Sequence, residues 1–173
     1  MVGGGTGGTI VANNLAHRLH REIVDGKVEI TLVDPSPYHV YQPAFLLMPF
    51  HIMQESEAIR PERSLLAETI KFRQERASRI DLNDRTVITD SARLQYDFLV
   101  IATGAQPDYS QIPGLERAGY DFYTLDSSIR LREALGRFSG ESWLLPLQEF
   151  HSSAPQPLWS SCFLPTPTLR GWG

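Results

Sequence analysis

Gly3-Gly4-Gly5-Thr6-Gly7-Gly8 is the stretch that decides the fold of this chain, and an amphipathic run over residues 9–23 follows it. Gly3, Gly5 and Gly8 have the spacing G-x-G-x-x-G. In this motif the first glycine makes the turn from a strand into a helix, and the second lets the main chain approach a diphosphate. The third lets the helix pack closely on the strand. The stretch therefore predicts a dinucleotide-binding turn, with the positive end of the following helix at the phosphates.

A second strand and an acid follow at the expected distance. Residues 28–33 are apolar enough to predict a buried strand, and Asp34 stands at its end. A carboxylate in this place accepts hydrogen bonds from ribose hydroxyls, and Thr6 offers a further donor to the phosphates. The alternative is a glycine-rich turn without a ligand, because an isolated G-x-G-x-x-G is a weak signal. The ordered set of turn, helix, strand and acid favours a dinucleotide.

The rest of the pattern predicts an α/β fold, with a parallel dinucleotide-binding sheet and a smaller antiparallel one. Three β-rich runs separated by polar turns predict a three-stranded meander over residues 70–80, 85–89 and 93–101. Residues 60–68 and 127–138 predict helices. The helix over residues 9–23 places Ile10, Leu15, Ala16 and Leu19 at helical spacings.

The segment after Asp34 is interrupted by Pro35, Pro37 and Pro43, which predict irregular backbone because each lacks an N–H donor. Residues 44–53 are apolar and predict a short core helix interrupted at Pro49. The alternative for this segment is an apolar wall over a planar cofactor, or a docking surface for a lipophilic substrate.

Only Met1 and Val2 precede the glycine motif, although a buried central strand usually has about five or six residues. We therefore expect either that the true start lies upstream or that the sequence is a fragment.

Composition limits the classes of function. The formal net charge is −4 with acids and bases mixed along the chain, which predicts no nucleic-acid partner. No apolar run reaches the length of a membrane-spanning helix, and a single cysteine, Cys162, allows no internal disulfide. His17 and His20 are the only histidines near metal-ligand spacing, and we expect them on a solvated helix face. These features predict a cytoplasmic protein without a metal site, and they leave open peripheral docking on the inner face of the cell membrane.

Residues 141–173 differ from the preceding chain. They hold all three tryptophans, five of the twelve prolines and the only cysteine. Neither a helical nor a strand period persists. We therefore expect residues 1–140 to form a partial domain whose first strand is truncated, and 141–173 to be an irregular, poorly ordered tail.

Four segments together resemble FAD-dependent pyridine-nucleotide disulfide oxidoreductases, and within them sulfide:quinone oxidoreductases and the related flavocytochrome sulfide dehydrogenases. The segments are Val2-Gly3-Gly4-Gly5-Thr6-Gly7-Gly8, Thr31-Leu32-Val33-Asp34-Pro35-Ser36-Pro37-Tyr38, Tyr96-Asp97-Phe98-Leu99-Val100-Ile101-Ala102-Thr103-Gly104 and Ile112-Pro113-Gly114-Leu115.

The resemblance implies a Rossmann-like FAD-binding fold and assigns a set of cofactor contacts. The glycine turn and its threonine would hold the diphosphate, and the acid would hold the adenosine ribose. A second FAD motif, a backbone contact to adenine and a segment near the isoalloxazine complete the set. The residues so assigned are Gly3, Gly5, Thr6, Gly8, Asp34, Gln42, Pro43, Ala77, Ala102, Thr103 and Gly104.

The resemblance also implies oxidation of sulfide, with electrons passing through the flavin to a quinone. That chemistry uses redox cysteines, and residues 1–140 contain none, so no catalytic residue is assigned and the chain is expected to be inactive alone. One alternative is a type II NADH:quinone oxidoreductase, which needs no cysteine pair. Another is a non-catalytic remnant of such an enzyme. The oligomeric state stays open.

The unusual tail has a specific explanation in this context. Read in a shifted frame, residues 151–161 permit a Lys-Cys-Pro-x-Ala-Pro-x-Glu run, which resembles the segment that bears a redox cysteine in this family. We therefore expect a frameshift after about residue 140, which the third bases of these codons would confirm or refute.

Overall fold

The computed structural model describes residues 1–110, 113–137, 139, 142–144 and 164–166. They form two compact units. The first consists of Met1–Tyr41 and Ile59–Ala105, and the second of Gln42–Ala58 and the described part of Gln106–Gly173. Each unit is therefore built from segments that are separated in the sequence.

A parallel sheet forms the centre of the first unit. Strand β1 (Ile30–Asp34) pairs in parallel with β4 (Ile70–Gln74) over its whole length. On its other side, Val2 forms parallel bridges to Val33 and to Ile101. The N-terminal segment therefore lies between β1 and the residues near position 101, as the parallel sheet of a dinucleotide-binding fold requires.

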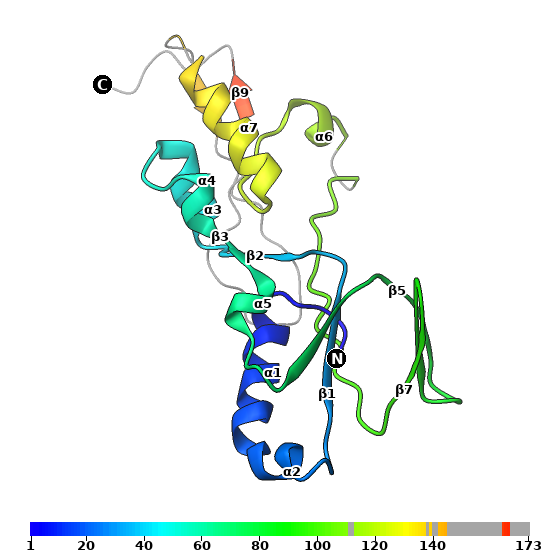
Figure 1. Ribbon diagram of the computed structural model, residues 1–173. Helices are drawn as coiled ribbons and strands as arrows, with labels where there is room; N and C mark the ends of the chain where they lie inside the picture. The colour runs from blue at the N-terminus through cyan, green and yellow to red at the C-terminus, as the bar shows by residue number, and fades with distance from the viewer. Residues whose placement is uncertain (111–112, 138, 140–141, 145–163, 167–173) are drawn as a thin grey trace. The chain divides into compact units, whose positions relative to one another are not determined.

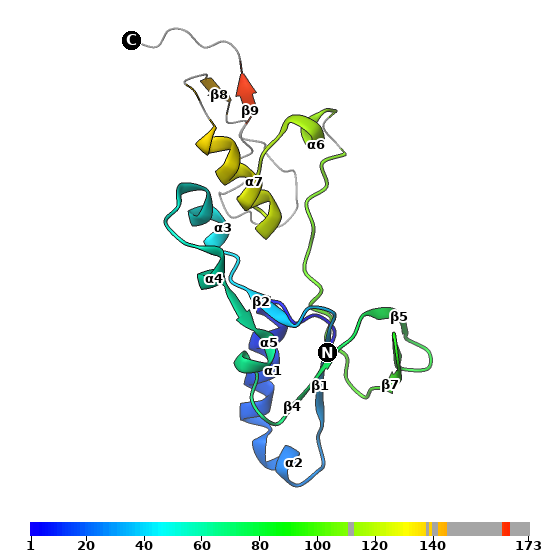
Figure 2. The same cartoon turned by 45° about the horizontal axis from the view of Figure 1, so that its top comes forward.

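Helices α1 (Thr6–Arg18) and α2 (His20–Val24) cover one side of this sheet (Figures 1 and 2). The predicted single helix over residues 9–23 thus starts three residues earlier and is interrupted at Leu19. Small residues make its contact with the strands, because Ala12 and Ala16 are buried in one cluster with Leu32 and others, whereas Ile10 is 54% exposed. Ile10, although it shares the helical spacing, therefore lies outside this core.

The meander lies on the other side of β1 (Figure 1) and consists of β5 (Ala77–Asp81), β6 (Thr86–Thr89) and β7 (Arg93–Gln95). Two of the predicted strands were wrong in extent. Residues 70–80 divide into β4 of the parallel sheet and β5 of the meander, and residues 93–101 divide into β7 and the segment beside Val2. The pairing with β1 ends where Glu75 N–H donates to the carbonyl of Asp34. The next residue belongs to the meander side, because Arg76 N–H donates to the carboxylate of Asp90.

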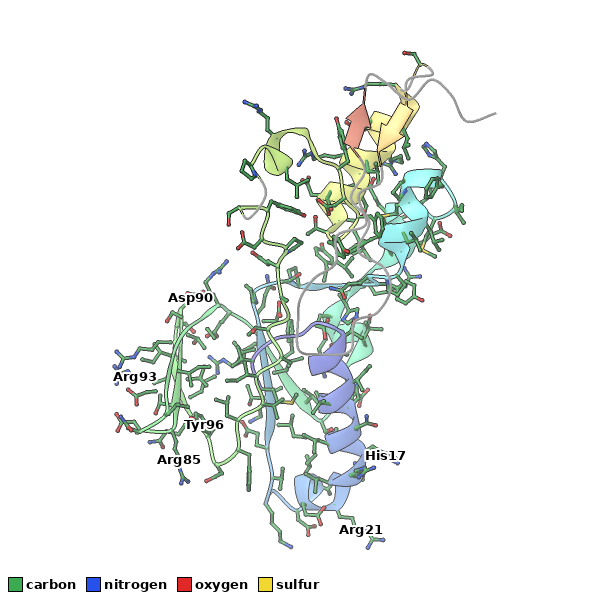
Figure 3. The ribbon with its side chains drawn as sticks, turned by 180° about the vertical axis from the view of Figure 1, so that it is seen from behind. His17, Arg21, Arg85, Asp90, Arg93 and Tyr96 are labelled. Carbon is green, nitrogen blue, oxygen red and sulfur yellow. The ribbon has the colours of Figure 1, made fainter. Side chains whose placement is uncertain are left out.

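Figure 3 shows the labelled meander residues Arg85, Asp90, Arg93 and Tyr96 on the side of β1 away from α1, which carries His17. His17 and His20 are both exposed, as expected for a solvated helix face.

A short antiparallel pair corrects the expectation of irregular backbone after Asp34. Strand β2 (Tyr38–Val40) pairs with β3 (Ile59–Pro61), and α5 (Glu62–Leu65) follows directly. Only this single turn remains of the helix predicted over residues 60–68. The prolines are compatible with this pairing, because Pro37 directly precedes β2 and Pro61 is the last residue of β3, where a ladder donor is not needed.

The second unit consists mainly of helices, α3 (Ala44–Leu47), the 3-10 helix η1 (Met48–Phe50), α4 (Glu55–Ala58), α6 (Leu115–Ala118) and α7 (Leu125–Gly136). Helix α7 packs on η1 and α3, and Phe45, Met48 and Leu131 are buried. The core helix predicted over residues 44–53 thus ends at Phe50, with one buried face, while Phe50 and Ile52 are exposed. Helix α7 begins after Thr124, whose side chain forms a capping box with Ser127.

Within residues 141–173, β8 (Ser142–Leu144) pairs antiparallel with β9 (Leu164–Thr166). The segment in which the shifted frame places a cysteine, residues 151–161, lies outside the described residues, and the frameshift remains a prediction. Among the described residues, no helix has the length and apolar character needed to cross a membrane.

Candidate functional site: a glycine turn next to an acid

The glycine turn is fixed by close packing of its own main chain. Gly3 has φ of +101°, and a Cβ placed on it would lie 2.2 Å from the carbonyl oxygen of Ala102. A Cβ on Gly8 would lie 1.8 Å from the carbonyl oxygen of Gly3. Glycine at both positions therefore stabilises the fold, because any side chain there would overlap main-chain atoms.

Gly5 differs from these two glycines. Apart from the residues adjacent in the chain, a Cβ built on it meets nothing within 4 Å, and its φ of −71° suits any residue. Folding alone therefore does not require glycine at this position. A bare main chain facing open space is what a diphosphate needs to approach closely.

Helix α1 begins directly at this open position, with Gly5 as its N-cap residue and Thr6 as its first helical residue. No side chain caps the end of this helix, and its first turn contains no acid. The first N–H groups of the helix and its positive dipole end are thus available to an anion.

The carboxylate of Asp34 points at the glycine turn. Its Oδ2 accepts the N–H of Gly4 at 2.6 Å, and its Oδ1 accepts the N–H of Ser36 at 2.7 Å. A carboxylate has about four acceptor positions, so both oxygens can still accept from a diol. Asp34 is half-buried at the end of β1, next to the turn as the sequence predicts.

The Ala-Thr-Gly segment lies on the other side of the turn from Asp34 along the sheet. Ala102 N–H donates to the carbonyl of Val2 at 2.8 Å, which places Ala102 against Gly3. Thr103 and Gly104 follow as exposed residues, and Gly104 has φ of +72°. The glycine turn, the acid and this segment are therefore brought together at one edge of the parallel sheet.

The other predicted contacts are placed in different ways. Ala77 begins β5, two residues after Glu75, whose N–H donates to the carbonyl of Asp34. Gln42 and Pro43 belong to the second unit, where Pro43 precedes helix α3 and the carbonyl of Gln42 accepts the N–H of Phe45. Ala77 therefore belongs to the same unit as the glycine turn, whereas Gln42 and Pro43 belong to the second unit.

Comparison with known proteins identifies the class of this arrangement. The family model of the pyridine nucleotide-disulphide oxidoreductases matches residues 1–144 of this chain. The chain belongs to this family. The family is FAD-dependent.

Two relatives of this chain have names that refer to a quinone. The chain is 30% identical over 116 residues to the mitochondrial sulfide:quinone oxidoreductase of Mus musculus, covering 66% of this chain and 24% of the mouse protein. It is 34% identical over 145 residues to the demethylphylloquinone reductase NdbB of Synechocystis sp., covering 78% of this chain and 34% of that protein.

A solved structure confirms the fold of the family. The sulfide:quinone oxidoreductase from the hyperthermophilic bacterium Aquifex aeolicus matches with a TM-score of 0.67 at 28% identity, over 78% of this chain and 30% of that chain. The predicted Rossmann-like α/β fold is thereby confirmed. The chain spans only about a quarter to a third of the length of these three relatives.

The residues at the glycine turn fit the adenosine-diphosphate half of FAD. The exposed main chain at Gly5 and the free end of α1 suit the diphosphate, and the remaining acceptor positions of Asp34 suit a ribose diol. Within the described residues, no group of three or more metal-ligating side chains is present.

One polar cluster beneath the turn was missed by the sequence analysis. Thr9 of α1, His39 of β2 and Glu62 of α5 meet at the carbonyl of Gly4, and the Glu62 side chain is only 1% exposed. The three residues are far apart in the sequence, and none has a spacing that signals a site.

Three ionisable groups of the first unit have clearly shifted pKa values and lie close to the parallel strands. The pKa of Glu29 lies below its ordinary value, chiefly because Lys71 donates a hydrogen bond to its carboxylate. Burial lowers the pKa of the α-amino group of Met1, which donates to the carbonyl of Thr31 at 2.6 Å. The pKa of Glu75 lies below its ordinary value, chiefly because the hydroxyl of Thr89 donates to its carboxylate, with Arg73 as a second donor.

Proposed function

We propose that this chain binds FAD, and that the active protein to which such a segment belongs oxidises sulfide and reduces a quinone. The observation that carries the FAD proposal is the pair formed by the open main chain at Gly5 and the carboxylate of Asp34, both adjoining Gly4. When bound, FAD supplies a ring that accepts two electrons from a donor and passes them to an acceptor.

The assigned residues would contact different parts of FAD. Gly5 and Thr6 would donate main-chain N–H groups to the diphosphate, with the Thr6 hydroxyl beside them. Asp34 would accept from the adenosine ribose, and Ala77 would approach the adenine through its backbone. The second FAD motif, Ala102, Thr103 and Gly104, would contact the cofactor on the side of Gly3 opposite Asp34. The family resemblance assigns Gln42 and Pro43 to the isoalloxazine.

Similarity to the sulfide:quinone oxidoreductases supports sulfide as the electron donor. A second candidate is oxidation of NADH with a quinone as acceptor. It is favoured by the absence of cysteine from residues 1–140, because sulfide chemistry in this class uses cysteine thiolates. In both cases the acceptor is a quinone, a lipophilic partner that suits a protein docked on a membrane surface.

The first test is selectivity among nucleotides. The 173-residue chain should quench FAD fluorescence on titration and bind ADP competitively, and it should not bind FMN, which lacks the adenosine diphosphate. Asp34→Ala should weaken FAD binding by roughly 1–3 kcal/mol through the lost hydrogen bonds. Asp90→Ala is the control, because its carboxylate also accepts a backbone N–H but lies on the meander. Equal affinity of wild type and Asp34→Ala would refute the ribose assignment.

A second test separates the candidates. In a protein whose reading frame is restored after residue 140, sulfide should bleach the visible absorbance of the bound flavin under anaerobic conditions. A water-soluble quinone should then reoxidise the flavin and restore this absorbance. Bleaching by NADH but not by sulfide would establish the second candidate. A chain that binds no FAD in either form would be a non-catalytic remnant.

A further inference from the structure

Beneath the glycine turn, three side chains converge on the carbonyl oxygen of Gly4. The Thr9 hydroxyl lies 2.9 Å from this oxygen, and Nδ1 of His39 lies 3.2 Å from it. Glu62 connects the two donors, with Oε1 at 2.6 Å from the Thr9 hydroxyl and Oε2 at 3.0 Å from Nδ1 of His39. We call these three residues the Gly4 clamp.

The surroundings determine the direction of the hydrogen bonds. Nδ1 of His39 faces the Gly4 carbonyl and the Glu62 carboxylate, which are both acceptors, so this nitrogen carries the hydrogen. Thr9 supplies one further hydrogen. The two hydrogens, one on Thr9 Oγ1 and one on His39 Nδ1, are thus shared among three oxygens. These are the two carboxylate oxygens of Glu62 and the Gly4 carbonyl oxygen, and the carbonyl oxygen contacts both donors.

The clamp is too buried and too specifically connected to be a solvated surface group. The Glu62 side chain is 1% exposed, Thr9 is 6% exposed and the His39 side chain is 13% exposed. A buried carboxylate without hydrogen bonds would be strongly destabilising, so Thr9 and His39 are required if Glu62 is to stay there.

The arrangement is not a nucleophilic triad, despite its composition. In such a triad the two nitrogens of the imidazole serve different partners, one the nucleophile and the other the acid. Here Nδ1 alone faces both Glu62 and the Thr9 hydroxyl, the latter at 3.5 Å. Both donors also contact the Gly4 carbonyl, so the cluster holds this main-chain group together with the Glu62 carboxylate.

Fixing this carbonyl also fixes the next N–H group. The peptide bond between Gly4 and Gly5 is trans, so its C=O and N–H point in opposite directions. Because the Gly4 carbonyl is held inward against the clamp, the Gly5 N–H is directed outward, where Gly5 faces open space. Asp34 holds the Gly4 N–H at the same time, so both polar groups of Gly4 are constrained by side chains.

We propose that the Gly4 clamp is a positioning device for the nucleotide. By holding the Gly4 carbonyl inward, Thr9, His39 and Glu62 keep the Gly5 N–H aimed at the diphosphate before the ligand arrives. This inference rests on the proposed binding of FAD. None of the three residues touches the ligand in this arrangement, and each acts through the peptide between Gly4 and Gly5.

The decisive variants are Thr9→Val, which removes the hydroxyl at nearly constant shape, and Thr9→Ser, which restores it. Thr9→Val should raise the FAD dissociation constant about tenfold, the effect of one lost hydrogen bond, and Thr9→Ser should return it to within about twofold of wild type. In the ligand-free protein, the Gly5 amide resonance should shift in Thr9→Val and return in Thr9→Ser.

Asn13→Ala is the matched control. Asn13 lies one turn further along α1 and bonds the carbonyl of Leu65 and the N–H of Ala67, both at 2.8 Å. Its loss weakens the contact of α1 with the same α5 region without touching Gly4. Asn13→Ala should lower the melting temperature, and it should leave the FAD dissociation constant and the Gly5 amide resonance unchanged.

Two results would refute the proposed positioning role of the Gly4 clamp. One is wild-type affinity in Thr9→Val, and the other is an equal loss of affinity in Thr9→Val and Asn13→Ala. A wild-type chain that binds no FAD would refute the proposed function instead. The Gly5 resonance would then still decide on the clamp, because its failure to move in Thr9→Val would show that the peptide is held by something else.

Discussion

The two units of this chain are stabilised in different ways. In the first unit, main-chain groups form parallel ladders, and the turn between strand and helix is held by polar side chains such as Asp34 and Thr9. In the second unit, helices from two distant segments pack through Phe45, Met48 and Leu131, and an ion pair joins Arg132 to Glu55.

This difference indicates where each unit tolerates change. Apolar packing accepts substitutions of similar volume, because shape is its main requirement. A main-chain turn that must present N–H groups in fixed directions depends instead on individual atoms, as the contacts of Gly3, Gly4 and Gly8 show. The first unit is therefore expected to be sensitive at single polar and glycine positions, and the second mainly at its buried apolar ones.

The largest effects should come from truncating one core residue in each unit. Leu32→Ala in the first unit and Leu131→Ala in the second should each cost roughly 2–5 kcal/mol, because both side chains are fully buried. Hydrogen exchange should show lost protection in β1 and α1 for the former, and in α7 for the latter. Lost protection in both units after either substitution would show that they unfold together, and the comparison would then fail.

The glycine turn offers a sharper contrast within one motif. Gly8→Ala should destabilise the protein by about 3 kcal/mol, because its Cβ would overlap the Gly3 carbonyl. Gly5→Ala should leave the free energy of unfolding within about 0.5 kcal/mol, since its Cβ meets open space, and should weaken FAD binding. Chemical denaturation and FAD titration of both variants check this, and equal destabilisation by the two would contradict the division of roles.

The sequence predicted the main features of the first unit because they are local. The glycine spacing, the strand that ends at Asp34 and the segment that ends at Ala102 each depend on a few adjacent residues. The same local pattern misplaced the strand boundaries, since residues 70–80 read as one strand although they serve two sheets. The decision between sheets depends on long-range bonds, such as the one from Glu75 N–H to Asp34, which no local pattern contains.

The candidate site shows the same limit. The residues that approach the turn along the sheet, such as Gly3 and Asp34, follow from the motif. His39 and Glu62 could not be predicted, because their meeting depends on the pairing of β2 with β3 across a proline-rich segment that reads as irregular. A buried charged group has no sequence signal of its own, since its burial is decided by its partners.

A smaller effect is expected from the ion pair of the second unit. Nη2 of Arg132 lies 2.8 Å from Oε1 of Glu55, but the Glu55 side chain is 42% exposed. Solvent screening should limit the contribution of the pair to about 0.5–1 kcal/mol, and Arg132→Met should keep much of the packing of its aliphatic part. A double-mutant cycle with Glu55→Gln measures the coupling, and a value near that of a buried pair would show polar dependence like that of the first unit.

The smallest effect concerns pH and the polar contacts of the first unit. The pKa of Glu75 is lowered chiefly by the Thr89 hydroxyl, and that of Glu29 chiefly by Lys71. Because both folded-state pKa values are lowered, both contacts stabilise the fold at neutral pH, and this contribution is lost as the pH falls through the folded-state pKa. Thr89→Val should therefore raise the pKa of Glu75, and the stability difference from wild type should vanish in acid. Carboxyl resonances followed against pH measure this directly.

Added salt should raise the pKa of Glu29, whose side chain is 60% exposed, more than that of Glu75, whose first partner is uncharged. Equal responses to salt would mean that charge, rather than a directed hydrogen bond, governs Glu75, and the polar contacts of the first unit would then resemble the ion pair of the second.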